Sequence, residues 1–338
     1  MVADYLDQFR DIPLIDVRTP SEYAQGHIPG ALNIPLFSDE ERARVGTVYK
    51  KQSRQEAMDL GYRYAEKKFD WYLSKAAKVA PRRRAVVHCW RGGMRSGSFG
   101  KHLEKHGFRE VYVLEGGYKA FRQYALESFR RPDTLYILGG YTGSGKTHIL
   151  HVLAKRGAQV IDLEAIACHR GSAFGAIGQS AQPTNEHFTN LLFWAWKELD
   201  MTKPVWLEDE SIHIGHVFIP EILFARMRRS PLFFLDIPRE QRARLLVEEY
   251  TGIDKALLSD SVRKISKRLG GQRTKDALDA IEREDYLTAA LFTLHYYDKY
   301  YRKGLQQRDV GKVSVIDSPT ADAEKNASLL FSRLEADE

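Results

Sequence analysis

The sequence has little cysteine and no long apolar run. Its 338 residues contain only two cysteines, Cys89 and Cys168, which excludes the disulfide framework of a small secreted protein. No apolar segment approaches the roughly 20 residues that span a bilayer. Residues 1–10 lack the basic-then-apolar order of a secretory signal. We therefore expect a cytoplasmic protein without a membrane partner, in which a cysteine either packs in a core or does chemistry.

The sequence also lacks a strong charge excess, internal repeats and low-complexity tracts. Its 51 Lys and Arg against 45 Asp and Glu give a net charge of +6 and a pI of about 9.1. This modest basic balance suits a polyanionic partner, but it suits an enzyme of small phosphates equally well. With 43% hydrophobic residues, the chain is long enough for two globular domains.

The first part of the chain alternates short apolar runs with helical patterns. Such alternation predicts an α/β domain with a parallel sheet, which we place at residues 1–130. Ser21 is the predicted cap of a first helix. The predicted strands cover residues 14–17, 32–35, 85–89 and 110–114, and longer helices are predicted over 53–79 and 96–106.

A second α/β domain is predicted over residues 134–338, after a charged linker at 130–133 that contains Pro132. Its predicted strands cover residues 135–138, 158–161, 205–207 and 232–235, with a helix at 188–199. The region from Arg239 to Tyr301 is predicted to be mostly helical and is rich in charge. We expect it to form a helical, basic C-terminal part of this domain.

The loop 88–96 joins a predicted strand to a predicted helix and carries Cys89. At such a junction the backbone N–H groups can converge on one point and bind an anion. Together with Arg91 and Arg95 they should lower the pKa of Cys89 and favour the thiolate. The alternative is a buried strand-end cysteine without a chemical role. Reactive thiolates occur at helix N-termini flanked by arginine, which favours the chemical interpretation.

Two segments upstream of this loop resemble a known family. Residues 16–23 and 26–31 are similar to the N-terminal signature of rhodanese domains, and the Cys89 loop stands where the rhodanese active-site loop is expected. The resemblance implies that Cys89 carries a chalcogen atom as a persulfide or perselenide, with Arg91 and Arg95 beside it. His88, Cys89 and Arg95 also match the cysteine-phosphatase pattern, and phosphatases are built on the same fold.

Residues 140–147 fit the P-loop pattern G-x-x-x-x-G-K-[ST] at every fixed position, after a predicted strand and before a helix. The pattern predicts that Lys146 reaches the outer phosphate and that Thr147 would be the ligand of Mg²⁺. No other metal site or resident cofactor is predicted. The predicted phosphate-binding residues are Gly140, Gly143, Ser144, Gly145, Lys146 and Thr147.

Acidic and basic residues at other strand ends are candidate partners of the P-loop. Asp162 ends the strand after the P-loop helix and would face the loop if the two strands were adjacent. Asp209 lies in a Glu-Asp-Glu run after another strand, with Asp236 as its competitor. A lone acidic residue at such a place is often a helix cap instead. His169 and Arg170 begin a glycine-spaced loop that would either bind phosphate or form a turn.

The order of the two domains resembles that of the bacterial tRNA 2-selenouridine synthases. Cys168 departs from the pattern, because an Asn is expected before His169. Further segments carry the resemblance, at residues 89–96, 116–120, 139–147 and 169–175.

The resemblance implies a two-step modification of tRNA at the wobble position of the anticodon region. Geranyl diphosphate would alkylate the sulfur of 2-thiouridine, and selenium from selenophosphate would then replace that sulfur to give 2-selenouridine. Two other hypotheses stay open. One is a P-loop kinase with a regulatory rhodanese-like or cysteine-phosphatase-like domain, and the other is a binding module in which the cysteine loop is inert.

A basic segment at residues 259–275 is the candidate tRNA-binding surface. On one helix its arginines and lysines would recur at three- and four-residue spacing and share a face, matching the phosphates of a nucleic-acid backbone. Tyr250 and Tyr286 could stack on an unpaired base. The alternatives are a solvated helix face and a lid over the P-loop. The candidate residues are Arg263, Lys264, Lys267, Arg268 and Arg273.

Overall fold

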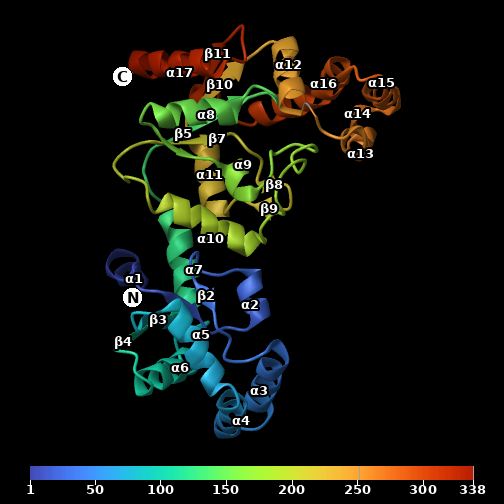
Figure 1. Ribbon diagram of the computed structural model, residues 1–338. Coiled ribbons are helices and arrows are strands. Elements are labelled where there is room, and N and C mark those ends of the chain that lie inside the picture. The colour runs from blue at the N-terminus through green and yellow to red at the C-terminus, as the bar shows by residue number, and fades with distance from the viewer. Residues whose placement is uncertain (251, 338) are drawn as a thin grey trace. The chain divides into compact units, whose positions relative to one another are not determined.

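The computed structural model describes residues 1–250 and 252–337. The chain divides into two compact units, and the colours of Figure 1 give the residue numbers along it. Unit 1 comprises Met1–Ser128 and Thr189–Trp194, and unit 2 comprises Phe129–Phe188 and Ala195–Glu338. The chain thus enters unit 2 at Phe129, close to the charged stretch at residues 130–133.

Unit 1 is built around a four-stranded parallel sheet with the strand order β2-β1-β3-β4. Its strands are β1 (Leu14–Asp16), β2 (Leu32–Asn33), β3 (Arg84–His88) and β4 (Glu110–Val113). Its helices are α1 (Val2–Gln8), α2 (Pro20–Gln25), α3 (Asp39–Lys51), α4 (Arg54–Glu66), α5 (Phe69–Val79), α6 (Met94–Lys105) and α7 (Gly117–Ser128).

Local sequence signals set the helix boundaries of unit 1. The structure differs from the predicted boundaries at three places. The cap of α2 is Thr19 rather than Ser21, and Pro20 takes the first helical position. The predicted helix 53–79 is two helices, because the chain turns at Lys67 and Lys68, and Lys68 forms an ion pair with Glu41 of α3. Helix α3 was not predicted, although Ser38 and Glu41 form a capping box at its start.

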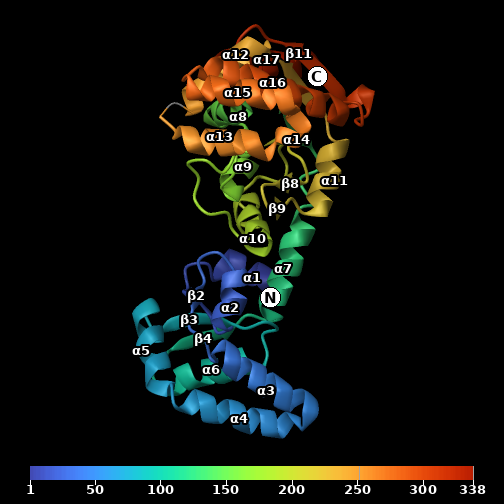
Figure 2. The same ribbon diagram turned by 90° about the vertical axis from the view of Figure 1, so that its right-hand side faces the viewer.

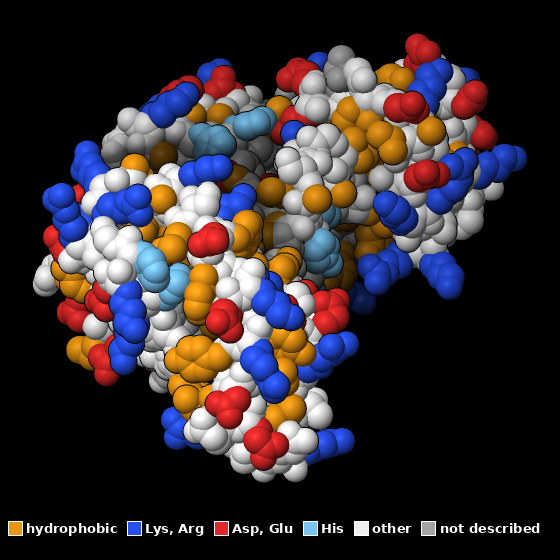
Figure 3. All heavy atoms as spheres, turned by 60° about the horizontal axis from the view of Figure 1, so that its bottom comes forward, with side chains coloured by type: hydrophobic (Ala, Val, Ile, Leu, Met, Phe, Trp, Pro, Cys, Tyr) orange, Lys and Arg blue, Asp and Glu red, His pale blue; other side chains and the backbone are white. Residues whose placement is uncertain are grey.

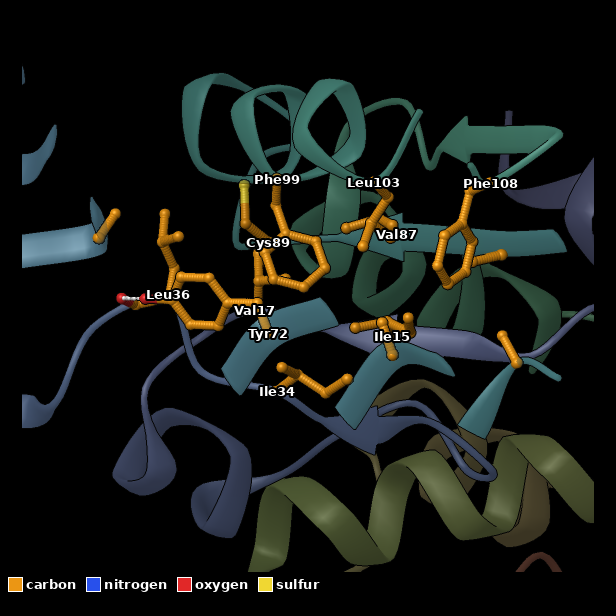
Figure 4. Close-up of a cluster of buried hydrophobic side chains, with 14 of the residues drawn as sticks. Ile15, Val17, Ile34, Leu36, Tyr72, Val87, Cys89, Phe99, Leu103 and Phe108 are labelled. Carbon is orange, nitrogen blue, oxygen red and sulfur yellow. Dashed lines mark hydrogen bonds between the residues drawn. The ribbon is translucent and has the colours of Figure 1, made fainter. Parts of the chain in front are cut away.

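The core of unit 1 lies between the sheet and the helices α5 and α6. Figure 4 shows Ile15 and Val17 from the β1 side, Val87 from β3 and Phe99 and Leu103 from α6 in one buried cluster. All five side chains are almost fully inaccessible to solvent. Burial of apolar side chains is the main stabilising contribution to folding, so this cluster fixes the end of β3 where the cysteine loop begins.

Unit 2 contains a five-stranded parallel sheet with the order β11-β10-β5-β7-β6 and a two-stranded antiparallel pair. The strands are β5 (Leu135–Gly140), β6 (Gln159–Ile161), β7 (Val205–Glu208), β8 (His213–Ile214), β9 (Val217–Phe218), β10 (Leu232–Asp236) and β11 (Val313–Asp317).

The helices of unit 2 form the rest of the domain. They are α8 (Lys146–Lys155), α9 (Leu163–Ala167), α10 (Asn185–Trp196, which the division between the units crosses), α11 (Glu221–Arg229), α12 (Arg239–Tyr250), α13 (Lys255–Lys264), α14 (Ser266–Leu269), α15 (Gly271–Glu282), α16 (Tyr286–Leu305) and α17 (Ala323–Asp337), with a 3₁₀ turn at Val310–Lys312.

Two apolar clusters stabilise unit 2. The first joins the sheet to α8 and α17, with Leu138, Leu153 and Leu330 among its fully buried members. The second lies among α13, α14, α15 and α16, which form the helical part predicted from the sequence. Figure 2 shows these four helices together within unit 2. No helix among residues 1–250 and 252–337 is long and apolar enough to cross a membrane.

Both units confirm the predicted α/β fold with parallel sheets. The prediction missed β11, which pairs with β10 over Leu232 to Asp236. Three of the five residues of β11 are only partly buried. The alternation of buried and exposed residues along β11 is therefore weak, and its sequence does not predict a strand. The strand order also separates β5 from β6 by β7. The condition under which Asp162 would face the P-loop is therefore not met.

Candidate functional site

The cysteine loop of unit 1 leaves β3 at His88 and enters α6 at Met94. Cys89 is buried, and the Ser96 hydroxyl donates a hydrogen bond to its Sγ at 3.3 Å. In Figure 4 the Cys89 sulfur lies at one end of the buried cluster, near Phe99. The Cys89 thiol is therefore packed against the buried cluster, and it accepts a hydrogen bond from a hydroxyl in the first turn of α6.

The pKa of Cys89 lies below its ordinary value. Burial raises the pKa, but the hydroxyl and backbone N–H of Ser96, the charge of Arg95 and the backbone N–H of Arg91 together lower it by more. Hydrogen bonds and positive charge stabilise the thiolate, which is the nucleophilic form of cysteine. The predicted thiolate nest thus has a physical basis in this loop.

The two predicted arginines contribute in different ways. Arg91 acts through its backbone N–H, and its side chain is exposed. Arg95 donates to the Glu22 carboxylate at 2.8 and 3.3 Å, and this contact helps to lower the pKa of Glu22 against the opposing effect of burial. Glu22 therefore orients Arg95, a role that the sequence analysis did not assign to it.

Two residues of the segment 16–23, Asp16 and Arg18, form a buried ion pair. Arg18 donates to both carboxylate oxygens of Asp16 at 2.7 to 3.1 Å, and both side chains are fully buried. The Arg18 guanidinium also lies 3.7 Å from the centroid of the Tyr118 ring. Breaking such a pair leaves an uncompensated buried charge. Asp16 and Arg18 hence hold the end of β1 next to the cysteine loop.

The start of α7 holds the cysteine loop from the other side. Tyr118 N–H donates to the Cys89 carbonyl, and Lys119 N–H donates to the Trp90 carbonyl, both at 2.9 Å. A Cβ on Gly117 would lie 2.3 Å from the same Cys89 carbonyl, and Gly117 has a φ of 58°. Only glycine fits this close approach, which accounts for the Gly-Gly pair at 116–117.

The P-loop of unit 2 wraps the N-terminus of α8 as the sequence predicts. Gly143 and Gly145 have φ values of 79° and 72°, in the left-handed region that favours glycine. Arg242 supports the loop from behind by donating to the Thr142 carbonyl at 3.0 Å, and it is itself paired with Asp298. The loop is therefore preformed, with backbone N–H groups available to phosphate oxygens.

Three carboxylates surround the P-loop lysine, and we name Glu164, Glu208 and Glu210 the carboxylate cluster. Burial lowers the pKa of Lys146, but Tyr301 and the three carboxylates raise it above its ordinary value. Burial raises the pKa of Glu208 far above the usual range, and burial together with Glu164 raises that of Glu210 to about 8. The cluster thus favours the protonated form of Lys146, while burial favours the protonated forms of Glu208 and Glu210.

Thr147 contacts this cluster directly. Its hydroxyl donates to Glu164 at 3.0 Å, and the Glu164 N–H donates to Glu208 at 2.9 Å. The second oxygen of Glu208 is buried without a partner among the described residues. No group of three or more His, Cys, Asp or Glu in residues 1–250 and 252–337 could hold a metal ion alone. Mg²⁺ usually binds one or two carboxylates plus substrate phosphates, and Thr147 and Glu164 fit that requirement.

Two predicted acidic partners have other roles. Asp162 caps α9 by accepting from Ala165 N–H at 2.7 Å, and it also contacts His151. Asp209 accepts a hydrogen bond from Arg308, while its flanking residues belong to the carboxylate cluster. Glu208 is the last residue of β7, and the chain that follows it brings Glu210 to the Lys146 side and Asp209 to Arg308. The structure therefore replaces Asp209 by its two neighbours.

The loop at residues 169–175 reaches the carboxylate cluster. A Cβ on Gly171 would lie 2.7 Å from Glu210 and 2.9 Å from Glu164, so the loop backbone packs on these carboxylates. His169 Nδ1 accepts from the Gly171 N–H at 3.1 Å. The Arg170 guanidinium lies 5.7 Å from the Tyr250 ring. The loop is thus brought to the P-loop by Gly171, while His169 shapes the turn.

The predicted basic helix face is interrupted. Arg263 and Lys264 end α13, Lys267 and Arg268 lie in α14, and Arg273 lies in α15. Ile265 alone separates α13 from α14, and Ile265 and Leu269 are buried in the apolar cluster of the helical part. All five basic side chains are exposed, but Arg263 is paired with Asp260 at 2.8 Å, and Arg268 donates to the Tyr296 hydroxyl at 3.3 Å.

The predicted base-stacking tyrosines are also placed differently. Tyr250 and Tyr286 are partly buried and pack against the apolar cluster of the helical part. Figure 3 draws one face of the molecule, on which Lys and Arg are mostly interspersed with Asp and Glu. A tRNA surface at the exposed basic residues therefore stays a prediction, and so does a stacking role for these two partly buried tyrosines.

Several residues that build these sites were not found from the sequence. Glu22, Glu164 and Tyr301 lie far along the chain from the groups they contact, at separations that no local pattern encodes. Arg242 and Asp298 are paired across two helices of unit 2. Among these residues only Glu208 and Glu210 have a signal in the sequence, the Glu-Asp-Glu run after a strand. Which residues of this run face the P-loop depends on the sheet.

Comparison with known proteins agrees with this geometry. Residues 133–321 match the tRNA 2-selenouridine synthase AAA domain, and residues 2–124 match the rhodanese-like domain. The chain belongs to the tRNA 2-selenouridine synthase family. A tRNA 2-selenouridine synthase of Nitrosomonas europaea is 33% identical over 89% of this chain and 91% of its own length.

Two further relatives show the same extent of similarity. The tRNA 2-selenouridine synthase of Bdellovibrio bacteriovorus is 35% identical over 89% of this chain and 91% of the relative. That of Marinobacter nauticus is 35% identical over 94% of both chains. The family similarity therefore covers both units, including the segments that contain the cysteine loop and the P-loop.

Proposed function

We propose that this protein is a tRNA-modifying transferase that replaces the sulfur of wobble 2-thiouridine with selenium in two steps. The observation that supports this most is the presence on one chain of two anion sites with different chemistry, a stabilised thiolate at Cys89 and a complete P-loop at residues 140–147. The names of the relatives support tRNA as the substrate and selenation as the outcome. The anticodon region and a cytoplasmic location belong to the same proposal.

The first step takes place at the P-loop with geranyl diphosphate. The thiocarbonyl sulfur attacks C1 of the geranyl group, the C1–O bond breaks, and diphosphate leaves while the base loses its N3 proton. Lys146 and the P-loop N–H groups stabilise the negative charge that develops on the diphosphate. Mg²⁺ held by Thr147 and Glu164 would neutralise further charge on that leaving group.

The second step uses selenium from selenophosphate. Alkylation converts the sulfur into a good leaving group, so the selenium of selenophosphate can attack C2 of the base and expel geranyl thiol. Water then cleaves the P–Se bond, which releases phosphate and leaves 2-selenouridine. Cys89 is the residue to which the rhodanese-like domain gives the chalcogen-handling role. Its lowered pKa and the donors around it suit a nucleophile that works at neutral pH.

A reconstituted reaction tests this proposal. Purified protein is mixed with 2-thiouridine-containing tRNA and geranyl diphosphate, with or without selenophosphate, and the nucleosides are quantified by mass spectrometry. We expect S-geranyl-2-thiouridine without selenophosphate and 2-selenouridine with it. Turnover of ATP with a soluble acceptor, and no change in the tRNA, would instead support the kinase hypothesis and overturn the transferase.

A further inference from the structure

An apolar pocket opens beside the P-loop, within unit 2. Thr142 of the P-loop and Ser172 of the loop 169–175 belong to its lining. Almost all of the remaining lining is aliphatic or aromatic and comes from α12, α13, α15, α16 and Phe174. Ser172 directly follows Gly171, which packs on the carboxylate cluster. The polar part of the lining is therefore the part nearest to the P-loop.

Helix α16 forms one wall of this pocket and connects it to Lys146. Six residues of α16 line the pocket at a spacing of three or four, which places them on one helix face. Farther along the helix, the ring of Tyr301 lies 5.7 Å from the Lys146 amino nitrogen. The six residues are Tyr286, Ala289, Ala290, Thr293, Leu294 and Tyr297.

Two hydroxyl groups of this wall, those of Thr293 and Tyr297, form hydrogen bonds with the backbone. The Thr293 hydroxyl donates to the Ala290 carbonyl at 2.9 Å. The Tyr297 hydroxyl accepts from the Ala173 N–H at 3.1 Å. Phe174 packs on Tyr250, with ring centroids 6.1 Å apart. The pocket thus offers carbon surface to an occupant, and few groups that could recognise a polar one.

We propose that this pocket binds the hydrocarbon chain of a prenyl diphosphate whose diphosphate lies in the P-loop, and that α16 sets the chain length. The inference rests on the proposed function and adds the location and the length limit. An α-helix rises about 1.5 Å per residue, so Ala290 lies about 10 Å beyond Tyr297 along the axis. Tyr286 lies about 6 Å farther still. The small Ala289 and Ala290 leave room in the wall, and Tyr286 limits its far end.

Binding without tRNA tests the pocket independently of transfer. The full chain is titrated with inorganic diphosphate, geranyl diphosphate and farnesyl diphosphate by calorimetry. In the unmodified protein we expect geranyl diphosphate to bind at least tenfold more tightly than inorganic diphosphate, because the tail leaves water. Ala290→Phe should fill the pocket and remove most of this advantage while leaving inorganic diphosphate binding unchanged.

Ala256→Phe is the matched control, because Ala256 is exposed on α13 and lies outside the pocket. It should keep the full advantage of the geranyl tail. Tyr286→Ala should move the preference towards farnesyl diphosphate, a gain that a misfolded protein cannot show. Equal affinity of the unmodified protein for geranyl and inorganic diphosphate would overturn the proposal, and so would equal weakening of both ligands by Ala290→Phe.

The same variants separate the pocket from the proposed function. A geranyl advantage that Ala290→Phe removes, without any transfer to tRNA, would keep the pocket and contradict the transferase. Geranyl transfer that proceeds unchanged in Ala290→Phe, with unchanged binding, would contradict the pocket and keep the transferase. A specific loss of ATP affinity in Ala290→Phe, with geranyl diphosphate unaffected, would assign the pocket to a nucleotide base and overturn the proposal.

Discussion

The cysteine loop and the P-loop are built alike but are charged differently. Each follows the carboxyl end of a parallel strand and precedes a helix, and each contains glycines in left-handed conformations. Around Cys89 the donors are a hydroxyl, N–H groups and Arg95, all of which favour the anion. Around Lys146 the neighbours are carboxylates, which favour the cation. One loop thus stabilises a nucleophile of the protein, whereas the other holds a cation ready for the anion of a substrate.

The largest expected effect separates the two loops at Cys89. Cys89→Ser should abolish 2-selenouridine formation, lowering it by about 1,000-fold or more, because the role is covalent and a serine hydroxyl is far less acidic. Geranylation of the tRNA should continue. Nucleoside mass spectrometry measures both products. Cys168→Ser is the control and should behave as the unmodified protein. Normal selenation by Cys89→Ser would remove this residue from the mechanism.

The next effect concerns Lys146. Lys146→Ala should lower geranyl transfer by about 100-fold or more, the usual cost of removing a charge-stabilising group from a leaving group. Steady-state geranylation assays with purified tRNA measure it. The control is Lys155→Ala, an exposed change in the last turn of the same helix. Equal rates for Lys146→Ala and the control would show that the P-loop does not act on the diphosphate.

A smaller effect is expected at Ser96. Ser96→Ala removes the hydroxyl donor to the thiolate and should raise the pKa of Cys89. The thiolate fraction grows as the pH rises through the pKa, so the pH profile of Cys89 alkylation should shift to higher pH and the rate at pH 7 should fall. Iodoacetamide labelling across pH 5 to 10 provides the measurement.

Ser98→Ala, on the same helix α6, is the matched change without a contact to the sulfur. Its alkylation profile should overlay that of the unmodified protein. Identical profiles for all three proteins would mean that the N–H groups and Arg95 set the acidity of the thiol without the Ser96 hydroxyl.

The smallest effect is predicted at the exposed basic residues of α13 and α14. Replacing Arg263, Lys267 and Arg268 with Ala should weaken tRNA binding and reduce its salt dependence. Each lost phosphate contact should reduce the log–log slope by about 0.9 in duplex and about 0.7 in single strands. Filter binding at several salt concentrations measures the slope. A lid over the P-loop would instead leave tRNA affinity unchanged and impair use of the diphosphate substrate.

A triple replacement of Lys50, Lys51 and Lys67 in unit 1 removes the same number of exposed charges. It distinguishes a local tRNA surface from a general effect of net charge. If both triple variants reduce the slope equally, the basic segment has no special role.

The sequence predicts each loop but not its surroundings. The P-loop and the cysteine loop are local, because their glycines and the strand-to-helix change are consecutive in the chain. The acidic partners are not local. Asp209 and Glu208 are neighbours in sequence, yet Glu208 accepts from the Glu164 N–H and Asp209 accepts from Arg308. The strand order decides which acidic residues lie beside the P-loop, because β7 rather than β6 lies next to β5.

The basic segment shows the same limit in a helix. Spacing alone places Arg263, Lys264, Lys267 and Arg268 on one face. Ile265 and Leu269 are buried in the apolar cluster of the helical part, and the segment is divided between α13 and α14 at Ile265. The spacing of the basic residues does not predict this division. Tyr301 and Asp298 reach their sites only through the fold, and Glu22, although it lies in the signature segment 16–23, meets Arg95 only there.

The central claim is that the two loops carry out separate, consecutive steps, and a chase with pre-geranylated tRNA tests it most directly. Isolated S-geranyl-2-thiouridine tRNA is given with selenophosphate to Lys146→Ala and to Cys89→Ser, and 2-selenouridine is quantified. We predict that Lys146→Ala forms 2-selenouridine at nearly the rate of the unmodified protein, because its missing step has been supplied, while Cys89→Ser forms none. Failure of Lys146→Ala to convert this tRNA, or conversion by Cys89→Ser, would contradict the assignment of the two steps to the two loops.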